Sequence, residues 1–280
     1  MSTTALGHAF DVLEAIKQSP GGLTNSEISR RLEIPKSSCS YVLDRLESNG
    51  YLVRTKDGRR YRIGPTILAL AYGALRDMGF RSATEPALYK LASETGLSAS
   101  IAILERNRAL VVDRVESPAV WKSGSTDLPI SKFAPHHVRR REQREIGREL
   151  PPHSNSVGKV LLAYLPEEQL HALLARLELP RSTKNSISTK EKLLEELKLV
   201  RSQGYAIDRE EQYAGVFALA CPIVNDRGVV QAAVTVDGNS TDADWNDPWN
   251  LIPIVQEGAR EIAKSPLFNS SYLTDVALSS

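Results

Sequence analysis

The sequence is poor in cysteine and has no long apolar run, and each shortage excludes a class of protein. Cys39 and Cys221 are the only two cysteines among 280 residues, too few for a disulfide framework. We interpret both as buried thiols in a reducing compartment. No run approaches the roughly 18 apolar residues of a membrane span. Because the N-terminus also lacks the features of an export signal, we expect a soluble, cytoplasmic protein without membrane contacts.

Motifs for nucleotide, metal and covalent chemistry are missing as well. The chain contains neither the GxxxxGK nor the GxGxxG pattern. His136 and His137 stand without a cysteine or carboxylate at ligand spacing, so we expect them to have structural or surface roles and predict no metal site. Cys221 precedes Pro222 in an apolar stretch, where a small buried thiol is common. We therefore predict no cofactor and no catalytic residue.

The chain also lacks a large net charge of either sign. Its formal charge is +1, so any attraction to nucleic acid must come from local clustering of basic residues. Its hydrophobic and charged fractions, 41% and 25%, are typical of globular proteins. Since 280 residues exceed the usual size of one hydrophobic core, we expect one small and one larger domain.

The first thirty residues predict two helices. Apolar residues recur at spacings of three and four from Leu6 through Phe10 and Leu13 to Ile16, which is typical of one helical stripe, and the helix is expected to end at residues 20–22. Thr24 then opens a short second helix. Glu27, three residues further on, completes the pattern of a capping box.

The next thirty residues complete a DNA-binding motif. Residues 33–35 form a short break, after which Cys39, Val42, Leu43 and Leu46 resume helical spacing. This arrangement predicts a helix-turn-helix. Residues 51–63 contain two short β-prone runs around Asp57-Gly58, which indicates a hairpin that serves as a wing.

Basic and polar side chains of this region form the candidate DNA-contacting set. Residues 36–62 carry seven basic and three acidic side chains, a local charge of +4. We expect the third helix to contact bases in the major groove and the wing to contact phosphates or the minor groove. The candidates are Lys36, Ser37, Ser38, Ser40, Tyr41 and Arg45 on the helix, and Arg59 and Arg60 on the wing. The alternative is that this unit contacts only other proteins.

The rest of the sequence predicts a linker helix followed by an α+β domain. Pro65 suits the first turn of a helix that extends to about Gly79, and a second helix is expected from about Thr84 to Gly96. Further helices are expected after Ser154, after Pro166 and after Ser188, the last with a capping box completed by Glu191. Strands are expected at 101–103, 110–115, 217–224 and 229–236, and a frayed tail at 266–280.

Ordered blocks along nearly the whole chain resemble the IclR family of transcriptional regulators. In the N-terminal part the matching segments are 9–14, 22–24, 34–38 and 46–52. In the C-terminal part they are 150–159, 204–211, Gly215 and 221–223. The sequence departs from the family at Tyr41, where arginine is common, and at residues 121–141, which look like an insertion.

The resemblance implies a fold and an organisation. The fold class is an N-terminal winged helix-turn-helix, mainly α with a β-hairpin wing, plus a C-terminal α+β, GAF-like effector-binding domain. The expected boundaries are 1–64 for the DNA-binding domain, 65–82 for the linker helix, 83–266 for the effector-binding domain and 267–280 for the tail. By the same resemblance, the protein is expected to form a homodimer or homotetramer on a pseudo-palindromic operator in double-stranded DNA.

The resemblance also implies a site for a small organic effector. The positions that match the family's pocket are Ser156, Val157, Asp208, Val216, Ala218, Thr235 and Asp237. Independently of the family, small residues that open a helix at 154–158 offer backbone amides, which suit an anion or a carbonyl oxygen. Asp208 and Asp237 have an alternative interpretation as turn residues, beside Gly204 and Gly238.

A pair of buried carboxylates has a consequence for ligand choice. If Asp208 and Asp237 both faced one cavity, their repulsion would disfavour an anionic ligand unless one acid were protonated. A hydroxylated or cationic ligand is then expected.

Two other functions compete with regulation. The chain could be a small-molecule enzyme with an accessory domain, which turnover of a bound ligand would reveal. It could also be a ligand-binding module with an accessory interaction domain, which a salt-dependent DNA-binding assay would distinguish. The sequence leaves open whether a regulator of this kind activates or represses.

Overall fold

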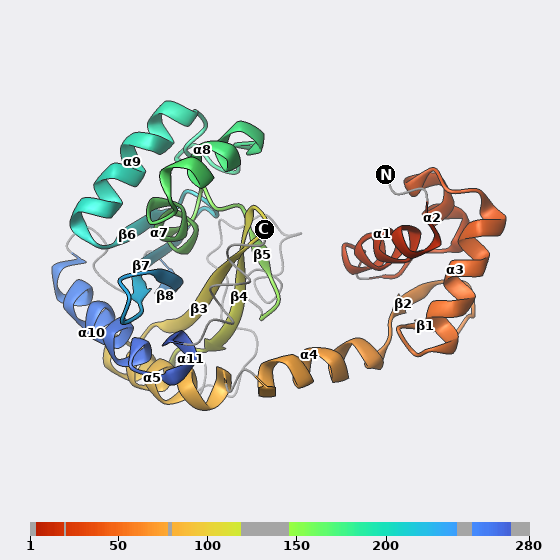
Figure 1. Ribbon diagram of the computed structural model, residues 1–280, viewed down its shortest axis with the longest axis horizontal. Helices are drawn as coiled ribbons and strands as arrows, with labels where there is room; N and C mark the ends of the chain where they lie inside the picture. The colour runs from red at the N-terminus through yellow and green to blue at the C-terminus, as the bar shows by residue number, and fades with distance from the viewer. Residues whose placement is uncertain (1–3, 20, 78–79, 119–145, 240–247, 270–280) are drawn as a thin grey trace. The chain divides into compact units, whose positions relative to one another are not determined.

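The chain divides into two compact units, and each is described by itself. The computed structural model describes residues 4–19, 21–77, 80–118, 146–239 and 248–269. The division falls between Met78 and Gly79, inside the segment expected to link the domains (Figure 1). The expected insertion at 121–141, with His136 and His137, lies outside the described residues, as does most of the expected tail. Within the described part, no helix is long and apolar enough to cross a membrane.

The N-terminal unit is a winged helix-turn-helix followed by a helix, as predicted. Its elements are α1 (Ala5–Lys17), α2 (Asn25–Leu32), α3 (Lys36–Ser48), β1 (Leu52–Arg54), β2 (Tyr61–Ile63) and α4 (Pro65–Asp77). The antiparallel pair β1 and β2 forms the wing. Pro65 is the first residue of α4, which confirms its predicted place in the first turn.

Local interactions fix the turn between α2 and α3. Thr24 caps α2 by accepting a hydrogen bond from the amide of Glu27, whose carboxylate accepts one from the Thr24 amide at 2.7 Å. The predicted capping box is therefore confirmed. Glu33 ends α2 in the left-handed region, with a φ of 56°, and α3 begins directly after Pro35.

The core of the N-terminal unit joins all three helices of the motif to the wing. Its buried members are Val12, Ile16, Ile28, Ile34, Cys39, Val42, Leu43, Leu52 and Tyr61. Leu6 and Phe10 of the predicted apolar stripe are instead exposed, because the buried face of α1 passes through Val12, Ala15 and Ile16. Spacing alone did not distinguish these two overlapping stripes.

The C-terminal unit is an α+β domain around one antiparallel sheet. Its strands are β3 (Ser98–Glu105), β4 (Arg108–Val115), β5 (Glu149–Leu150), β6 (Ala206–Arg209), β7 (Val216–Val224) and β8 (Val230–Asn239). Its helices are α5 (Phe80–Thr95), α7 (Ser156–Ala163), α8 (Glu167–Arg176), α9 (Lys190–Gln203), η2 (Pro248–Asn250), α10 (Leu251–Ala263) and α11 (Pro266–Asn269). The strand order is β5-β4-β3-β8-β7-β6.

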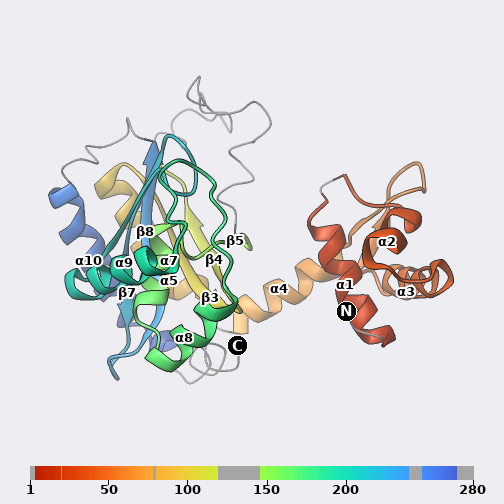
Figure 2. The ribbon, with the colours of Figure 1, turned by 90° about the horizontal axis from the view of Figure 1, so that it is seen from above.

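Helices cover both faces of this sheet (Figures 1 and 2). On one face α7, α8 and α9 pack over small strand residues, namely Ala102, Ala109, Ala206, Ala220 and Ala233. We call this the α7 face. On the opposite face α5 and α10 pack against the sheet and against each other. Gly258 permits that contact, because a Cβ atom there would lie 2.6 Å from the Leu91 side chain.

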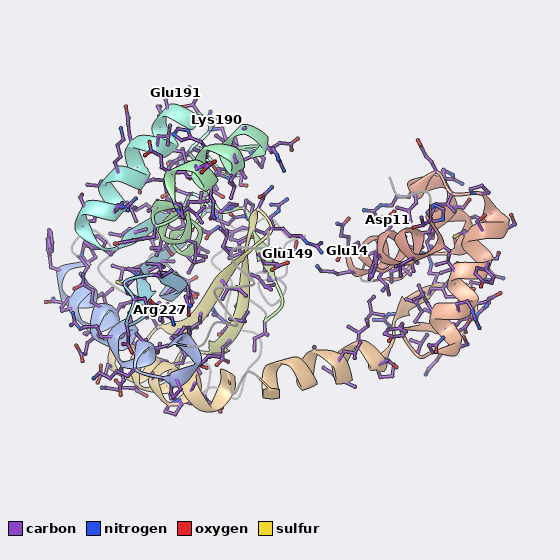
Figure 3. The ribbon with its side chains drawn as sticks, in the orientation of Figure 1. Asp11, Glu14, Glu149, Lys190, Glu191 and Arg227 are labelled. Carbon is purple, nitrogen blue, oxygen red and sulfur yellow. The ribbon has the colours of Figure 1, made fainter. Side chains whose placement is uncertain are left out.

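Several predicted details of the C-terminal unit are wrong. α5 begins at Phe80 rather than near Thr84, and it contains Pro86. The N-cap of α9 is Thr189, which accepts from the amide of Lys192, so Glu191 completes no capping box. Figure 3 shows Glu191 in the first turn of α9. Ser188 and Thr189 can both cap a helix, and the sequence did not reveal which of them does so.

The end of the chain also differs from its prediction. Residues 266–269, expected to fray, form α11, and Phe268 is fully buried. The sequence analysis did not predict β5, β6 or α10. β5 and β6 are short edge strands of two and four residues, for which periodicity gives little signal.

Candidate functional site

The recognition helix presents most of its predicted contact residues to solvent. Lys36, Ser37, Tyr41 and Arg45 are exposed on α3, while Ser38 is half-buried. Tyr41 is 59% exposed, an unusual position for a large aromatic side chain that has no core to fill. Polar and aromatic side chains on an exposed helix face can contact base edges and phosphates.

Ser40 has a different environment from its neighbours on α3. Its hydroxyl accepts a hydrogen bond of 2.7 Å from the side-chain amide of Asn25, the first residue of α2. The side chain is half-buried and holds the two helices of the motif together. This contact assigns Ser40 a structural role in the described part of the protein.

The two predicted wing arginines also differ from each other. Arg59 is exposed beside the turn at Gly58. Arg60 instead points back to α2, where its guanidinium donates to Glu27 at 3.2 Å and to the carbonyl of Gly22 at 2.8 Å. The amide and hydroxyl of Thr24, together with Arg60, hold the pKa of Glu27 below its usual value. Arg60 therefore fixes the wing to the helix-turn-helix.

The wing has a second anchor that the sequence analysis did not single out. Arg54 donates to Glu47 of α3 at 2.9 Å and lies over the ring of Tyr61, 4.8 Å from its centroid. The basic charge of the wing is thus partly neutralised by α3. The positive charge left for DNA is carried by fewer residues than the count of +4 implied.

On the C-terminal unit, the first turn of α7 forms the centre of the predicted effector site. Asn155 caps the helix by accepting from the amide of Gly158 at 2.8 Å. Gly158 lies against the backbone of Pro152, since a Cβ atom there would be 2.3 Å from the Pro152 Cα. The amides of Ser156 and Val157 occupy positions where a helix provides no intrahelical acceptor. Such amides favour an oxygen or an anion.

The Ser156 hydroxyl connects this turn to the sheet. Its Oγ lies 3.3 Å from Oγ1 of Thr235 on the central strand β8. Thr235 has one hydroxyl proton, which it directs to the carbonyl of Leu219 at 2.9 Å. Ser156 therefore donates to Thr235. Both side chains are buried, so they form a small polar island within an apolar layer.

Strand register brings the other predicted effector residues to the same face. Asp208, Ala218 and Asp237 are directly opposite one another on β6, β7 and β8. Because side chains alternate along a strand, Val216 and Thr235 share their face, which is the α7 face. The sequence positions thus converge in space around the first turn of α7.

Asp237 has an ionic partner that the sequence analysis missed. Arg114 of β4 donates to Asp237 at 2.8 Å and to Glu116 at 2.9 Å. Its side chain is only 6% exposed. Burial opposes the charge of Arg114, but the two carboxylates raise its pKa above the usual value. The available sequence signal was the position of Arg114 inside the strand expected at 110–115. Asp237 lies inside β8 and forms no turn with Gly238.

Asp208 is held separately by backbone amides. Its carboxylate accepts from the amide of Glu211 at 2.7 Å, so it caps the turn that follows β6 rather than a turn beside Gly204. Burial, with a contribution from the Glu211 charge, raises the pKa of Asp208 to about 7. Arg114, which is shared between Asp237 and Glu116, offsets part of their charge, and the raised pKa of Asp208 favours its protonated form, so both effects reduce the expected repulsion between Asp208 and Asp237. The expectation of a hydroxylated or cationic ligand stays a prediction.

A buried lysine lies one helical turn from Ser156. Lys159 is 1% exposed, and its ammonium donates to Glu211 at 2.6 Å, to the carbonyl of Ile207 at 2.7 Å and to Glu196 at 2.9 Å. All three protons of the ammonium are thus used. Burial lowers the pKa of Lys159, but the two carboxylates outweigh this and keep it above its usual value. The cluster joins α7 to α9 and to the turn after β6.

The remaining candidates for chemistry are inert in this structure. Cys39 and Cys221 are free and buried, as predicted, and burial raises the pKa of Cys221 to about 12. Such a thiol is a poor nucleophile at neutral pH. His153 is fully buried with Nε2 3.1 Å from the carbonyl of Pro180, and burial lowers its pKa. Among the described side chains, no group of three or more His, Cys, Asp or Glu could hold a metal ion.

Two family models match the chain, one in each unit. The model described as "Bacterial transcriptional regulator IclR C-terminal" matches residues 123–264, half of the chain. The model of the MarR family matches residues 4–62, which contain the winged helix-turn-helix.

Individual proteins show the same likeness. The HTH-type transcriptional regulator Rv1719 of Mycobacterium tuberculosis is 33% identical over 233 residues, which cover 82% of this chain and 80% of that protein. The crystal structure of Thermotoga maritima IclR is 26% identical, with a TM-score of 0.64, over 92% of this chain and 97% of that one. A double mutant of the PobR inducer binding domain from Acinetobacter, solved with 3-hydroxybenzoic acid, is 26% identical with a TM-score of 0.55. The match covers 66% of this chain and 97% of the PobR chain.

Proposed function

Because the chain belongs to the IclR family of bacterial transcriptional regulators, we propose that α3 and the wing bind an operator while the α7 face binds the effector. The protein is a DNA-binding transcriptional regulator, and its C-terminal domain binds a small molecule that modulates operator binding. The geometry supports specific residues for each step.

For the operator, the proposed contacts are the exposed members of the predicted set. Tyr41 and Arg45 contact base edges in the major groove, with Lys36, Ser37 and Ser38 around them. Arg59 contacts phosphate from the wing. Ser40 and Arg60 act indirectly, by holding α2, α3 and the wing in position. The observation that carries this proposal is the exposure of Tyr41 on a helix whose opposite face is fully packed.

A pseudo-palindromic operator requires two heads in one assembly. The N-terminal unit has large exposed apolar side chains on α1, at Leu6 and Phe10, and on α4, at Leu68 and Leu70. Such side chains support self-association, and we propose a dimer that can pair into a tetramer. Two heads on one side of the duplex would contact half-sites about 34 to 36 Å apart, or a multiple of this.

For the effector, the proposed ligand is a small organic acid that also carries a hydroxyl group. The amides at the start of α7 suit its carboxylate or carbonyl oxygen, and the Ser156–Thr235 pair suits its hydroxyl. The complex of the PobR domain with 3-hydroxybenzoic acid supports this class. The proposed site comprises Ser156, Val157, Asp208, Val216, Ala218, Thr235 and Asp237, together with Arg114, which pairs with Asp237.

We propose that the bound ligand is sensed and not converted. The relatives are named as transcriptional regulators, and the thiol of Cys221 is too basic for nucleophilic attack at neutral pH. The effector would shift DNA affinity by binding one arrangement of the dimer more tightly than another. We expect the ligand to be recovered chemically unchanged after long incubation with the pure protein. Formation of any product would support the enzyme alternative.

Calorimetric titration tests the effector site directly. We expect 3-hydroxybenzoate to bind and Thr235→Val to weaken binding by about tenfold, the loss associated with one buried hydrogen bond. Equal binding to both proteins would place the effector elsewhere. Binding of neither 3-hydroxybenzoate nor related hydroxy acids would overturn the proposed ligand class.

A further inference from the structure

The two outer edges of the C-terminal sheet are tied together by a pair of side chains. Arg148 directly precedes β5, the strand at one edge, and Tyr213 lies in the turn that follows β6, the strand at the other edge. The guanidinium of Arg148 nevertheless donates to the Tyr213 hydroxyl at 2.6 Å. It also lies 5.7 Å from the centroid of the tyrosine ring.

Such a contact requires the edges to converge. Neighbouring strands lie about 4.8 Å apart, so β5 and β6 would be separated by about 24 Å in a flat sheet, well beyond the reach of two side chains. The turn after β6 leans over the α7 face to close this gap. Glu211 contacts Lys159 at 2.6 Å, and Gln212 accepts from Ser154 at 2.6 Å.

The turn that presents Tyr213 is itself firmly held. Thr183 donates to the carbonyl of Glu210 at 2.6 Å, and Ser186 donates to the carbonyl of Glu211 at 2.7 Å. The contact between Arg148 and Tyr213 therefore joins one edge of the sheet to a fixed point above the first turn of α7. Thr235 lies on the α7 face of the same sheet, where it contacts Ser156 of α7.

Arg148 differs from the other arginine on this face. Arg114 donates to two carboxylates, whereas Arg148 forms no ion pair with any residue in the described part of the chain. Its Nε atom is buried and has no hydrogen-bond partner among those residues. The Arg148 guanidinium thus has a neutral phenol as its partner and one unused donor. A carboxylate would bind it more strongly than the phenol does, because hydrogen bonds between ionised groups are stronger.

We propose that Arg148 and Tyr213 form a clasp over the α7 face, and that the carboxylate of the entering effector replaces Tyr213 on the Arg148 guanidinium. This inference rests on the proposed effector site at Ser156 and Thr235. The clasp makes Arg148 the residue that selects an acid over a neutral analogue. Tyr213 controls how readily the site opens.

Access to the site can be measured without any ligand. Ser156→Cys places a thiol beneath the clasp, while Cys39 and Cys221 are buried. The thiol is then labelled with two methanethiosulfonate reagents of similar size, one negatively and one positively charged. The protein without Ser156→Cys corrects for the native thiols, and circular dichroism confirms that each variant folds.

The clasp predicts a specific pattern of labelling rates. Tyr213→Phe, which keeps the ring but removes the hydroxyl, raises the rate for both reagents by about tenfold, as expected for loss of one charge-assisted hydrogen bond. Arg148→Gln also raises the rate but abolishes the preference for the negative reagent, and Arg148→Lys retains that preference. Equal rates in all these proteins would overturn the clasp. Thr235→Cys repeats the test if Ser156→Cys does not fold.

Ligand titration then separates the clasp from the proposed effector site. The probes are 3-hydroxybenzoate and the neutral 3-hydroxybenzyl alcohol. Thr235→Val is expected to weaken both, whereas Arg148→Gln weakens only the acid, by about tenfold or more. Equal losses for the two probes on Arg148→Gln would contradict a role in selecting the carboxylate. If the unaltered protein binds neither probe, the proposed ligand class is wrong. The labelling rates still test whether Arg148 and Tyr213 restrict access to the site.

Discussion

The hydroxyl groups of Ser156 and Thr235 lie 3.3 Å apart, which joins the first turn of α7 to the central strand of the sheet. Seventy-nine positions separate the two residues in sequence, and both are buried. Their contact fixes the site that we assign to the effector. It also means that a ligand entering this site must exchange its own hydrogen bonds for theirs.

The first prediction concerns the hydroxyl of Thr235. Thr235→Val is expected to leave the operator affinity of the ligand-free protein unchanged while raising the effector concentration needed to alter DNA binding by about tenfold. Fluorescence anisotropy of labelled operator, with increasing effector, measures this shift. Thr95→Val is the matched control, since the Thr95 hydroxyl also donates to one backbone carbonyl, that of Leu91, and accepts one hydrogen bond, from the Leu97 amide at the end of α5. An equal shift in the control would remove the special role of Thr235.

The second prediction concerns the buried ammonium of Lys159. Lys159→Met leaves Glu211 and Glu196 without their cation, and loss of one member of a buried ion pair destabilises a protein by about 3–5 kcal/mol. Urea unfolding followed by circular dichroism measures the change. Lys90→Met removes an exposed ion pair with Glu261 and is expected to have little effect. Adding Glu211→Gln to Lys159→Met should recover part of the loss, and no recovery would contradict the cluster.

The third prediction concerns the pH dependence contributed by Asp208. Its pKa is raised to about 7 in the folded protein, above the value of an unfolded chain, so the folded state binds the extra proton between about pH 4 and 7. The free energy of unfolding contributed by this group therefore falls as the pH rises through that window, by up to about 1.4 kcal/mol per pH unit.

Asp208→Asn removes this titration. Urea unfolding at several pH values is expected to show a flatter profile between about pH 4 and 7 for this variant. A profile that stays equally steep in Asp208→Asn would show that Asp208 ionises normally in the folded state.

The fourth prediction separates the two arginines of the wing. Arg59→Ala is expected to reduce the slope of log affinity against log salt by about 0.9, because one phosphate contact is lost. Arg60→Ala should leave that slope nearly unchanged, since Arg60 is engaged with Glu27 and Gly22. Anisotropy titrations over a range of salt concentrations provide both slopes. The opposite result would assign the phosphate contact to Arg60.

The sequence predicted the N-terminal unit well because its signals are local. The capping box at Thr24 and Glu27, the break at 33–35 and the turn at Asp57-Gly58 each specify structure over a few residues. The sequence did not predict the internal engagement of Ser40 and Arg60. Their partners, Asn25 and Gly22, lie 15 and 38 positions away and come close only through folding.

The sequence predicted the outline of the C-terminal unit but not the ion pairs inside it. Alternating apolar residues indicated β3, β4, β7 and β8, and the family resemblance supplied the effector positions. Arg114 and Lys159 appeared in the sequence as ordinary basic residues. Strand order and register place Arg114 beside Asp237, and the packing of α7 against the sheet places Lys159 beside Glu211. No local sequence pattern encodes either contact.

Binding of the purified protein to fragments of its own genome at two salt concentrations tests directly whether α3 contacts DNA. We expect a small set of fragments to be retained at both concentrations, and we expect the replacement of Tyr41 and Arg45 of α3 by alanine to abolish this selection. Retention of no fragment at low salt, or selection that is unaffected by these replacements, would contradict the assignment of α3 as the DNA-contacting helix.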